Sequence, residues 1–199
     1  MFAYIKGILD TKTNGYIVVE TAGIGYKIFM SSKSMENLGE VGENVKVYTH
    51  YYVREDNISL YGFTSNEELR MFELLLSVSG IGAKSAIAML SEITPSSFAL
   101  AVISNDVTKL TKIPGIGKKT AARIVLELKD KLKTEEAIEK DEELEIAIKE
   151  DNKNSEVVAA LQVLGYTRKE IDKVLEKIDV DSLGLEGAIK KALQLLQNL

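Results

Sequence analysis

The sequence predicts a multidomain α+β protein, in which a small β-barrel precedes two helical domains that are joined by an acidic linker. Three observations support this prediction. Strand-like runs occupy the first third of the chain, a helical apolar period follows, and a Glu-rich stretch without aromatic residues separates the two helical parts. The 199 residues, 45% of them hydrophobic, suffice for one to three domains with modest cores. The expected domains are residues 1–63, 64–133, 134–154 and 155–199.

Short strands are expected in the first domain, because runs rich in β-branched and aromatic residues alternate there with glycine-containing turns. The clearest of these turns is Asn14-Gly15. The runs lie at 2–9, 16–21, 25–30, 45–53 and 58–62. Five short strands of this kind suggest a small barrel.

Residues 64–133 change to a helical period, with apolar residues recurring every three to four positions, as at Leu69, Phe72 and Leu76. The segment is therefore predicted to be all-helical. It holds 10 basic and 7 acidic residues, although the whole chain has a net charge of -5. The acidity of the chain is therefore a weak argument against a nucleic-acid partner for this segment.

Residues 134–154 hold 9 acidic and 3 basic residues and no aromatic residue, so they offer little apolar surface to offset the entropy of ordering. We predict a flexible linker with an r.m.s. reach of about 25 Å. An acidic helix with Leu144 and Ile148 on one face is the alternative, because the residues are good helix formers. After the linker, the apolar spacing predicts a compact three-helix domain with turns at Gly165-Tyr166 and Gly184.

An internal repeat is the strongest signal in the chain. Residues 75–86 (LLSVSGIGAKSA) align with residues 110–121 (LTKIPGIGKKTA), 35 positions later, with glycine on glycine and isoleucine on isoleucine. Each copy is predicted to form a helix, a Gly-Ile-Gly hairpin and a second helix, which together make a helix-hairpin-helix unit. The glycines permit backbone angles and close approaches that other residues resist, and the isoleucine fills the gap between the helices.

The two hairpins are predicted to bind phosphate groups. Exposed N–H groups and the positive end of the dipole at the start of the second helix attract an anion, and lysines follow directly. Amides and lysines contact the nucleic-acid backbone and not the base edges, so binding should be independent of sequence and should weaken with salt. Glycine-capped helix corners with solvated lysines are the plainer alternative. The predicted phosphate-binding residues are Gly80, Ile81, Gly82, Lys84, Gly115, Ile116, Gly117, Lys118, Lys119 and Arg123.

Composition excludes several kinds of site. The chain has no Cys and a single His, His50, which excludes disulfides, zinc fingers, iron–sulfur clusters and thiol nucleophiles. The phosphate-binding loop of ATPases needs Gly at position 112 and a hydroxyl residue at position 119, and both positions are Lys. We expect no catalytic residue, no metal and no cofactor. There is no secretory signal and no apolar run of about 18 residues, so we expect a cytoplasmic protein without a membrane segment.

Two features of the predicted barrel stay open on the residues alone. Glu55-Asp56-Asn57 is typical of a solvated turn or, less often, of a weak metal-binding pair in a nuclease. Several tyrosines suit a packed barrel, and they would also serve as stacking platforms for single-stranded nucleic acid. These are Tyr4, Tyr16, Tyr48, Tyr51 and Tyr52.

The order of these units resembles that of the RuvA family, the Holliday-junction-binding subunits of the bacterial branch-migration complex. The motifs that carry the resemblance are MFAYIKG at the start, VREDNISLYGF at 53–63 and IPGIGKKTA at 113–121. The resemblance covers the whole chain. It implies an OB-fold barrel, a tandem helix-hairpin-helix domain, a variable acidic linker and a C-terminal domain similar to ubiquitin-associated three-helix folds.

The resemblance also implies an assembly and roles for particular residues. The expected assembly is a four-fold symmetric homotetramer, or an octamer of two tetramers, on which the junction lies open and nearly square. Glu55 and Asp56 match the family's acidic pin, and Arg54 beside them is a candidate phosphate contact. The C-terminal domain is expected to bind the RuvB motor ATPase, and the RuvC resolvase is a further candidate partner. The candidate RuvB contacts, whose spacing suits a core equally well, are Leu161, Leu164, Tyr166 and Leu196.

The leading expectation is therefore a non-catalytic scaffold that recognises four-way DNA junctions and recruits an ATP-driven motor. One alternative is a helix-hairpin-helix glycosylase or nuclease, which would need a base-flipping pocket or a carboxylate-metal cluster. Another is a general binder of duplex nucleic acid. The ratio of junction affinity to duplex affinity separates the scaffold from the general binder, and DNA cleavage would indicate the enzyme.

Overall fold

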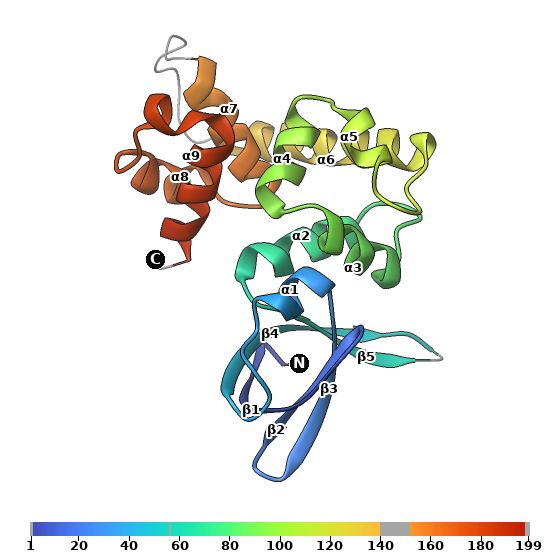
Figure 1. Ribbon diagram of the computed structural model, residues 1–199. Coiled ribbons are helices and arrows are strands. Elements are labelled where there is room, and N and C mark those ends of the chain that lie inside the picture. The colour runs from blue at the N-terminus through green and yellow to red at the C-terminus, as the bar shows by residue number, and fades with distance from the viewer. Residues whose placement is uncertain (1, 56, 140–151, 198–199) are drawn as a thin grey trace.

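The computed structural model describes residues 2–55, 57–139 and 152–197, and it confirms the predicted fold class (Figure 1). A closed five-stranded barrel lies at one end of the molecule. Helices α2 to α6 lie above the barrel, and helices α7, α8 and α9 pack to one side of α4. The chain thus combines one β-rich unit with two helical units.

The barrel consists of β1 (Tyr4–Thr13), β2 (Tyr16–Thr21), β3 (Ile24–Met30), β4 (Asn44–Val53) and β5 (Ile58–Phe63). Each strand lies within a few residues of its predicted range. The strands close in the order β1-β2-β3-β5-β4, with β3 and β5 parallel and the other pairs antiparallel, which makes the barrel OB-like. Alternate apolar residues such as Leu9, Ile17 and Val47 point inwards and are fully buried, as the period of two requires.

A short helix, α1 (Ser32–Glu36), connects β3 to β4. The apolar pattern does not predict it, because five residues are too few to show a helical period. Its N-terminus is capped by the Ser31 side chain, which accepts a hydrogen bond from the backbone N–H of Ser34. The helix also ties the barrel to the helical domain, since Lys33 Nζ donates to the Glu92 carbonyl oxygen at 2.8 Å.

The middle segment is helical, as predicted. It contains α2 (Asn66–Leu76), α3 (Ala83–Glu92), α4 (Pro95–Ile103), α5 (Val107–Thr111) and α6 (Lys118–Glu139). Helix α2 packs on the outside of the barrel, where the ring centroid of Phe72 lies 5.2 Å from that of Tyr61 and 5.0 Å from that of Phe63. This aromatic contact fixes the helical domain to β5.

Helix α6 extends into the segment predicted to be a linker, so residues 134–139 are helical and that part of the prediction is wrong. The physical reason is that Glu, Ala and Ile add to a helix already formed, where no new nucleus is needed. Residues 140–151 of the predicted linker, including Leu144 and Ile148, lie outside the described residues, and residues 152–154 belong to the next helix, 152–163.

The C-terminal domain has the three predicted helices, α7 (Asn152–Val163), α8 (Arg168–Leu175) and α9 (Val180–Leu196). Helix α8 begins with a capping box, in which Thr167 and Glu170 satisfy each other's backbone N–H groups. Both predicted turns occur at glycines with positive φ, since φ is 79° at Gly165 and 67° at Gly184.

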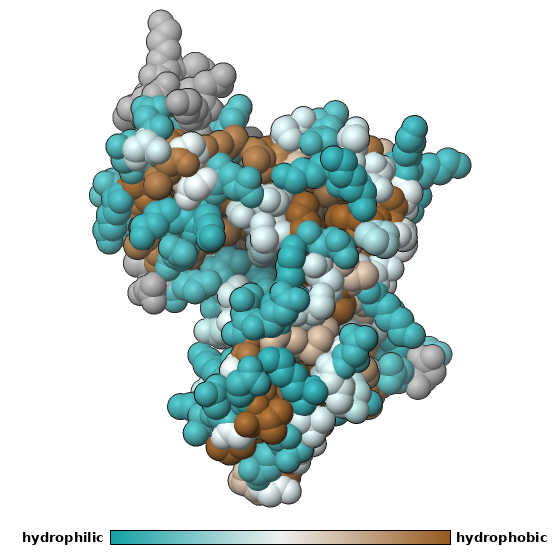
Figure 2. All heavy atoms as spheres, in the orientation of Figure 1, coloured by the Kyte–Doolittle hydropathy of each residue, from teal (hydrophilic) through white to brown (hydrophobic). Residues whose placement is uncertain are grey.

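One apolar core runs from the end of β5 through the middle helices into the C-terminal helices. Helix α4 lies at its centre and packs against both α6 and α7, with Phe98, Ala99 and Val102 fully buried. Figure 2 shows apolar surface on the barrel as well as on the helical units. Most of the large hydrophobic side chains that stay exposed belong to the barrel. These are Phe2, Tyr4, Ile8, Ile24, Val41, Val53 and Ile58.

Within the described ranges, no single helix is long and apolar enough to cross a membrane. Helices α3 and α4 pass that test of length and composition only when taken together, across a bend of 99°.

Candidate nucleic-acid interface

The first predicted hairpin connects α2 to α3. Two backbone hydrogen bonds of 3.1 Å shape it, from Val78 N to Leu75 O and from Ile81 N to Val78 O. Gly80 has a φ of 84°, in the left-handed region where glycine is the unstrained residue. Gly82 then forms the N-cap of α3 and provides no side-chain cap, so the first amides of α3 stay available to a ligand.

The second hairpin, between α5 and α6, has the same hydrogen bonds. Ile113 N donates to Leu110 O at 3.2 Å, and Ile116 N donates to Ile113 O at 3.0 Å. Gly115 has a φ of 83°, close to that of its counterpart in the first hairpin. The Gly117 carbonyl accepts the first hydrogen bond of α6 at 2.9 Å. The predicted repeat is therefore confirmed in three dimensions.

The two hairpin isoleucines support the hairpins and do not line a ligand site. The side chains of Ile81 and Ile116 are 7% and 6% exposed, which confirms that they fill the gap between the helices. Their backbone N–H groups donate within the hairpins. Neither the side chain nor the amide therefore faces outwards, and the prediction that these two residues contact phosphate is corrected to a supporting role.

The entrances of α3 and α6 are open and basic. A Cβ atom placed on Gly82 or Gly117 would meet no other atom within 4 Å, so a phosphate has room to approach the main chain. Lys84, Lys118 and Lys119 are exposed beside these entrances, and none of the three forms an ion pair with a described residue. Each hairpin therefore combines open amides, the positive end of a helix dipole and exposed lysines, which are the features that attract an anion.

Arg123 lies at the first hairpin, although its position in the sequence suggests the second. Its Nη1 atom donates to the carbonyl oxygen of Ser79 at 3.1 Å. One turn later on α6, Glu127 Oε2 accepts a hydrogen bond from the backbone N–H of Ser79 at 3.1 Å. A Cβ on Gly80 would lie 3.3 Å from Arg123 Nη1, so the guanidinium stands directly beside that hairpin. The second repeat thereby fixes the position of the first.

The acidic turn is the connection between β4 and β5. Arg54 N donates to Asn57 O at 2.8 Å and Asn57 N to Arg54 O at 3.4 Å, so these residues close a tight hairpin. Glu55 is exposed, and Asp56 lies outside the described residues. The guanidinium of Arg54 is held on Tyr52, with Nε donating to Tyr52 Oη at 2.8 Å. A positive charge thus stands at the base of an acidic turn.

The four candidate contacts of the C-terminal domain are buried, so none of them is a surface residue in this arrangement. Leu161 and Leu164 are fully buried, and Leu196 is nearly so, because the three-to-four spacing places them in the core of the domain. Tyr166 is covered by α2, where its hydroxyl donates to Glu67 Oε1 at 3.3 Å. The three leucines therefore fit the alternative, in which they belong to the core of the domain.

Three residues that shape these sites carry no signal in the sequence. Glu127 and Ser79 connect the two hairpins. Glu67 accepts a hydrogen bond from Tyr166 of the C-terminal domain. No spacing rule links positions 48 or 99 residues apart, so only the folded chain shows these contacts. Among the described residues, no group of three or more His, Cys, Asp or Glu is placed to hold a metal ion.

Known proteins resemble this chain along its length. The family models described as RuvA N terminal domain, SAM-like Helix-hairpin-helix tandem and RuvA, C-terminal domain match residues 1–62, 72–130 and 152–197. A relative from Acetivibrio thermocellus, named Holliday junction branch migration complex subunit RuvA, is 50% identical over 197 residues that cover 98% of each chain. Relatives of the same name from Ruminiclostridium cellulolyticum and Clostridium perfringens (strain ATCC 13124) are 49% and 48% identical, covering 98% of this chain and 100% and 99% of theirs.

Proposed function

The chain belongs to the RuvA family, and on that premise we propose that it is a non-catalytic subunit that binds Holliday junctions. It holds the four-way junction open and square and recruits the hexameric RuvB ATPase for branch migration in homologous recombination and DNA repair. ATP hydrolysis belongs to RuvB. We place the protein in the cytoplasm, where its DNA substrate lies.

The observation that carries the proposal is the pair of matched hairpins. Each offers a helix entrance, an open glycine and at least one unpaired lysine, and Arg123 fixes the two hairpins in one orientation. Two rigidly spaced anion sites suit two phosphates of one duplex arm. Because amides and lysines read no base edges, affinity comes from the shape and charge of the DNA and not from its sequence.

The acidic turn opens the centre of the junction. Carboxylates placed next to phosphates repel the strands where they exchange, and Glu55 and Asp56 are proposed to do this at the crossover. Arg54, held on Tyr52 at the base of the turn, contacts a backbone phosphate. Repulsion at the centre and attraction along the arms together favour an open, square junction.

Four copies of the chain match the four arms of a junction, so we propose a homotetramer, or an octamer of two tetramers that enclose the DNA. Exposed apolar side chains on the barrel, such as Val41, Val53 and Ile58, provide surface for subunit contacts. The C-terminal domain binds RuvB. The DNA face left open by a single tetramer would also admit the RuvC resolvase.

The proposed function is tested with a synthetic junction that contains mobile homologous arms. The chain, RuvB and ATP together should convert this junction into duplex products, while either protein alone should not. The chain alone should hydrolyse no ATP. Conversion by RuvB at the same rate with and without the chain would contradict the proposed role.

A further inference from the structure

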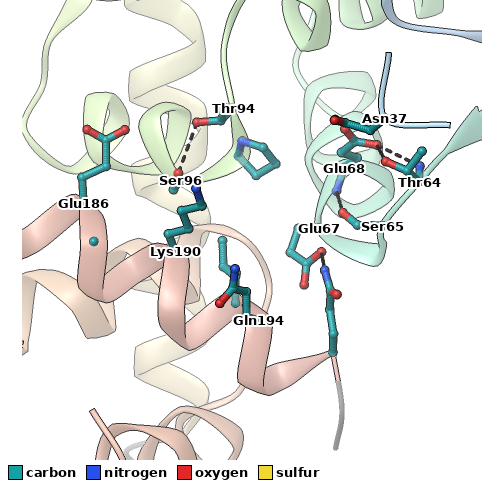
Figure 3. Close-up of a pocket in the computed structure, with 14 residues that line it drawn as sticks. Asn37, Thr64, Ser65, Glu67, Glu68, Thr94, Ser96, Glu186, Lys190 and Gln194 are labelled. Carbon is teal, nitrogen blue, oxygen red and sulfur yellow. Dashed lines mark hydrogen bonds between the residues drawn. The ribbon is translucent and has the colours of Figure 1, made fainter. Parts of the chain in front are cut away.

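The C-terminal domain is fastened to the DNA-binding helices through a buried carboxylate. Glu67, in the first turn of α2, is 3% exposed. Its oxygens accept hydrogen bonds from the Tyr166 hydroxyl at 3.3 Å and from the side-chain amide of Gln197, at the end of α9. Figure 3 shows Glu67 pointing from α2 towards the end of α9. A carboxylate that has lost its water needs such partners, so the contact is specific.

Arg70 completes the contact one turn along α2. Its guanidinium carbon lies 4.1 Å from the centroid of the Tyr166 ring, and Nη1 donates to the carbonyl oxygen of Gly165. The positive φ of Gly165 shapes the turn that presents this carbonyl and this ring together. We refer to Glu67, Arg70, Gly165 and Tyr166 as the clasp.

Burial raises the pKa of the Tyr166 hydroxyl, and the nearby Glu67 carboxylate raises it further. The hydroxyl therefore stays protonated and remains a hydrogen-bond donor over the physiological pH range. Titration of Tyr166 itself therefore does not open the clasp in that pH range.

The rest of the interface is only partly closed. Helices α4 and α7 pack through apolar residues, but α9 faces α2 and α4 across a cleft of about 530 Å³ (Figure 3). Polar side chains such as Lys190 and Gln194 line the cleft from α9, and Ser96 lines it from α4. Interfaces between domains of one chain are commonly more polar than permanent interfaces, and domains joined in this way can move relative to each other.

We propose that this arrangement is a closed state of the chain, in which the clasp covers the Tyr166 turn and keeps the C-terminal domain from its motor partner. The inference rests on the proposed recruitment of a motor ATPase by this domain. A partner that binds only the released domain has its apparent affinity reduced by the fraction of chains that are released. The clasp, together with the apolar packing of α4 against α7, therefore sets how readily the motor is recruited.

Junction binding is independent of the clasp. Glu67 and Arg70 lie in the first half of α2, while the first hairpin follows the last residue of that helix. Roughly 9 Å of helix separates Arg70 from the hairpin, at about 1.5 Å per residue. Opening the clasp should therefore change motor recruitment and leave phosphate contacts at the hairpins unchanged.

The first experiment measures docking without any partner. The chain has no Cys, so nitroxide labels at Ser104→Cys on the end of α4 and Lys191→Cys on α9 report the distance between the domains in the full-length protein. We expect one narrow distance for the otherwise unchanged chain, and a longer or broader distribution after Arg70→Met or Tyr166→Phe. Arg168→Ala is the matched control, since Arg168 pairs with Asp172 in its own helix. Unchanged distances in both clasp variants would overturn the proposal.

The second experiment locks the closed state. Ser97 on α4 and Glu186 on α9 are hydrogen-bonded partners, so Ser97→Cys and Glu186→Cys can be joined by a short bismaleimide. We expect the cross-linked chain to bind RuvB at least tenfold more weakly than the same variant without cross-linker, with junction affinity unchanged within twofold. Equal RuvB binding by the two forms would overturn the inhibitory role. If neither form binds RuvB while the label distances respond to clasp variants, motor recruitment itself is wrong.

Discussion

Arg123 on α6 donates a hydrogen bond of 3.1 Å to the carbonyl oxygen of Ser79, which lies 44 residues earlier in the chain. Glu127 accepts a hydrogen bond from the backbone N–H of the same serine, so one helix of the second repeat binds both backbone polar groups of Ser79 in the first hairpin. The two hairpins therefore keep a fixed spacing. If both hairpins bind one duplex arm, as proposed, the fixed spacing avoids the entropy cost of orienting two separate sites.

Replacing Arg123 by Gln should weaken junction binding and lower its dependence on salt. The change removes the charge beside Gly80 and loosens the link between the hairpins, so we expect an affinity loss of about tenfold and a salt slope reduced by about 1. Fluorescence anisotropy titrations at several salt concentrations measure both quantities. An unchanged slope would mean that Arg123 only supports the hairpin.

Lys118 and Lys119 should contribute more to the salt dependence than any other pair of lysines on the chain. Substitution of both by Ala is expected to lower the slope of log affinity against log salt by about 2, or about 1 for each lysine. Lys169→Ala with Lys177→Ala, which removes two exposed lysines of the C-terminal domain, is the matched control and should leave the slope unchanged. Equal slopes for the two double variants would contradict the assignment.

The two glycines of the second hairpin should respond differently to alanine. Gly115→Ala puts a Cβ at a positive φ and should lower the free energy of unfolding by about 1–2 kcal/mol. Gly117→Ala meets no atom within 4 Å and should leave stability unchanged, but its methyl group occupies the space predicted for a phosphate. Thermal unfolding and junction titration of both variants test this. Full junction affinity in Gly117→Ala would place the phosphate elsewhere.

Neutralising the acidic turn should preserve binding. Glu55→Gln with Asp56→Asn removes the charges proposed to repel the strands at the crossover, so affinity should stay the same or increase while the junction centre opens less. The fluorescence of 2-aminopurine placed at the crossover measures this opening. Greatly weakened binding by a folded variant would indicate a role for the carboxylates other than repulsion.

The capping box of α8 should make a small, pH-dependent contribution to stability. Hydrogen bonds from the backbone N–H and the hydroxyl of Thr167 lower the pKa of Glu170 below its ordinary value of 4.5. The stabilisation is therefore present above pH 4.5 and is lost as the pH falls through the lowered pKa. Glu170→Gln should reduce stability by no more than about 1 kcal/mol at pH 7, with a smaller difference at pH 3. A stability difference between the two proteins that does not change with pH would contradict a contribution from the ionised Glu170 carboxylate.

The sequence predicts the barrel and the hairpins well, because both depend on local rules. The strand ranges follow from the alternation of apolar and polar residues. The repeated glycines, Gly80 and Gly115, indicate a backbone with positive φ, which favours glycine. The contacts between units are not predictable in this way. Arg123 has the residue type of a phosphate contact, but only the packing of α6 against the first hairpin shows where its charge lies.

The predicted contacts of the C-terminal domain show a different limit. Leu161 and Leu164 have the spacing of an apolar helix face, and a core and a docking surface share that spacing. The linker shows a third limit, since Glu-rich sequence is compatible both with disorder and with extension of α6 to Glu139. In each case a tertiary contact or an adjoining helix, and not local composition, decides the outcome.

The most direct test of the central claim is a competition titration of the purified full-length protein with a synthetic four-way junction and with linear duplex of equal length, in magnesium and without ATP. The account predicts binding that is at least tenfold tighter to the junction, with all DNA strands left intact. Equal affinity for the two DNAs would contradict junction recognition, and cleavage of either would contradict a non-catalytic subunit.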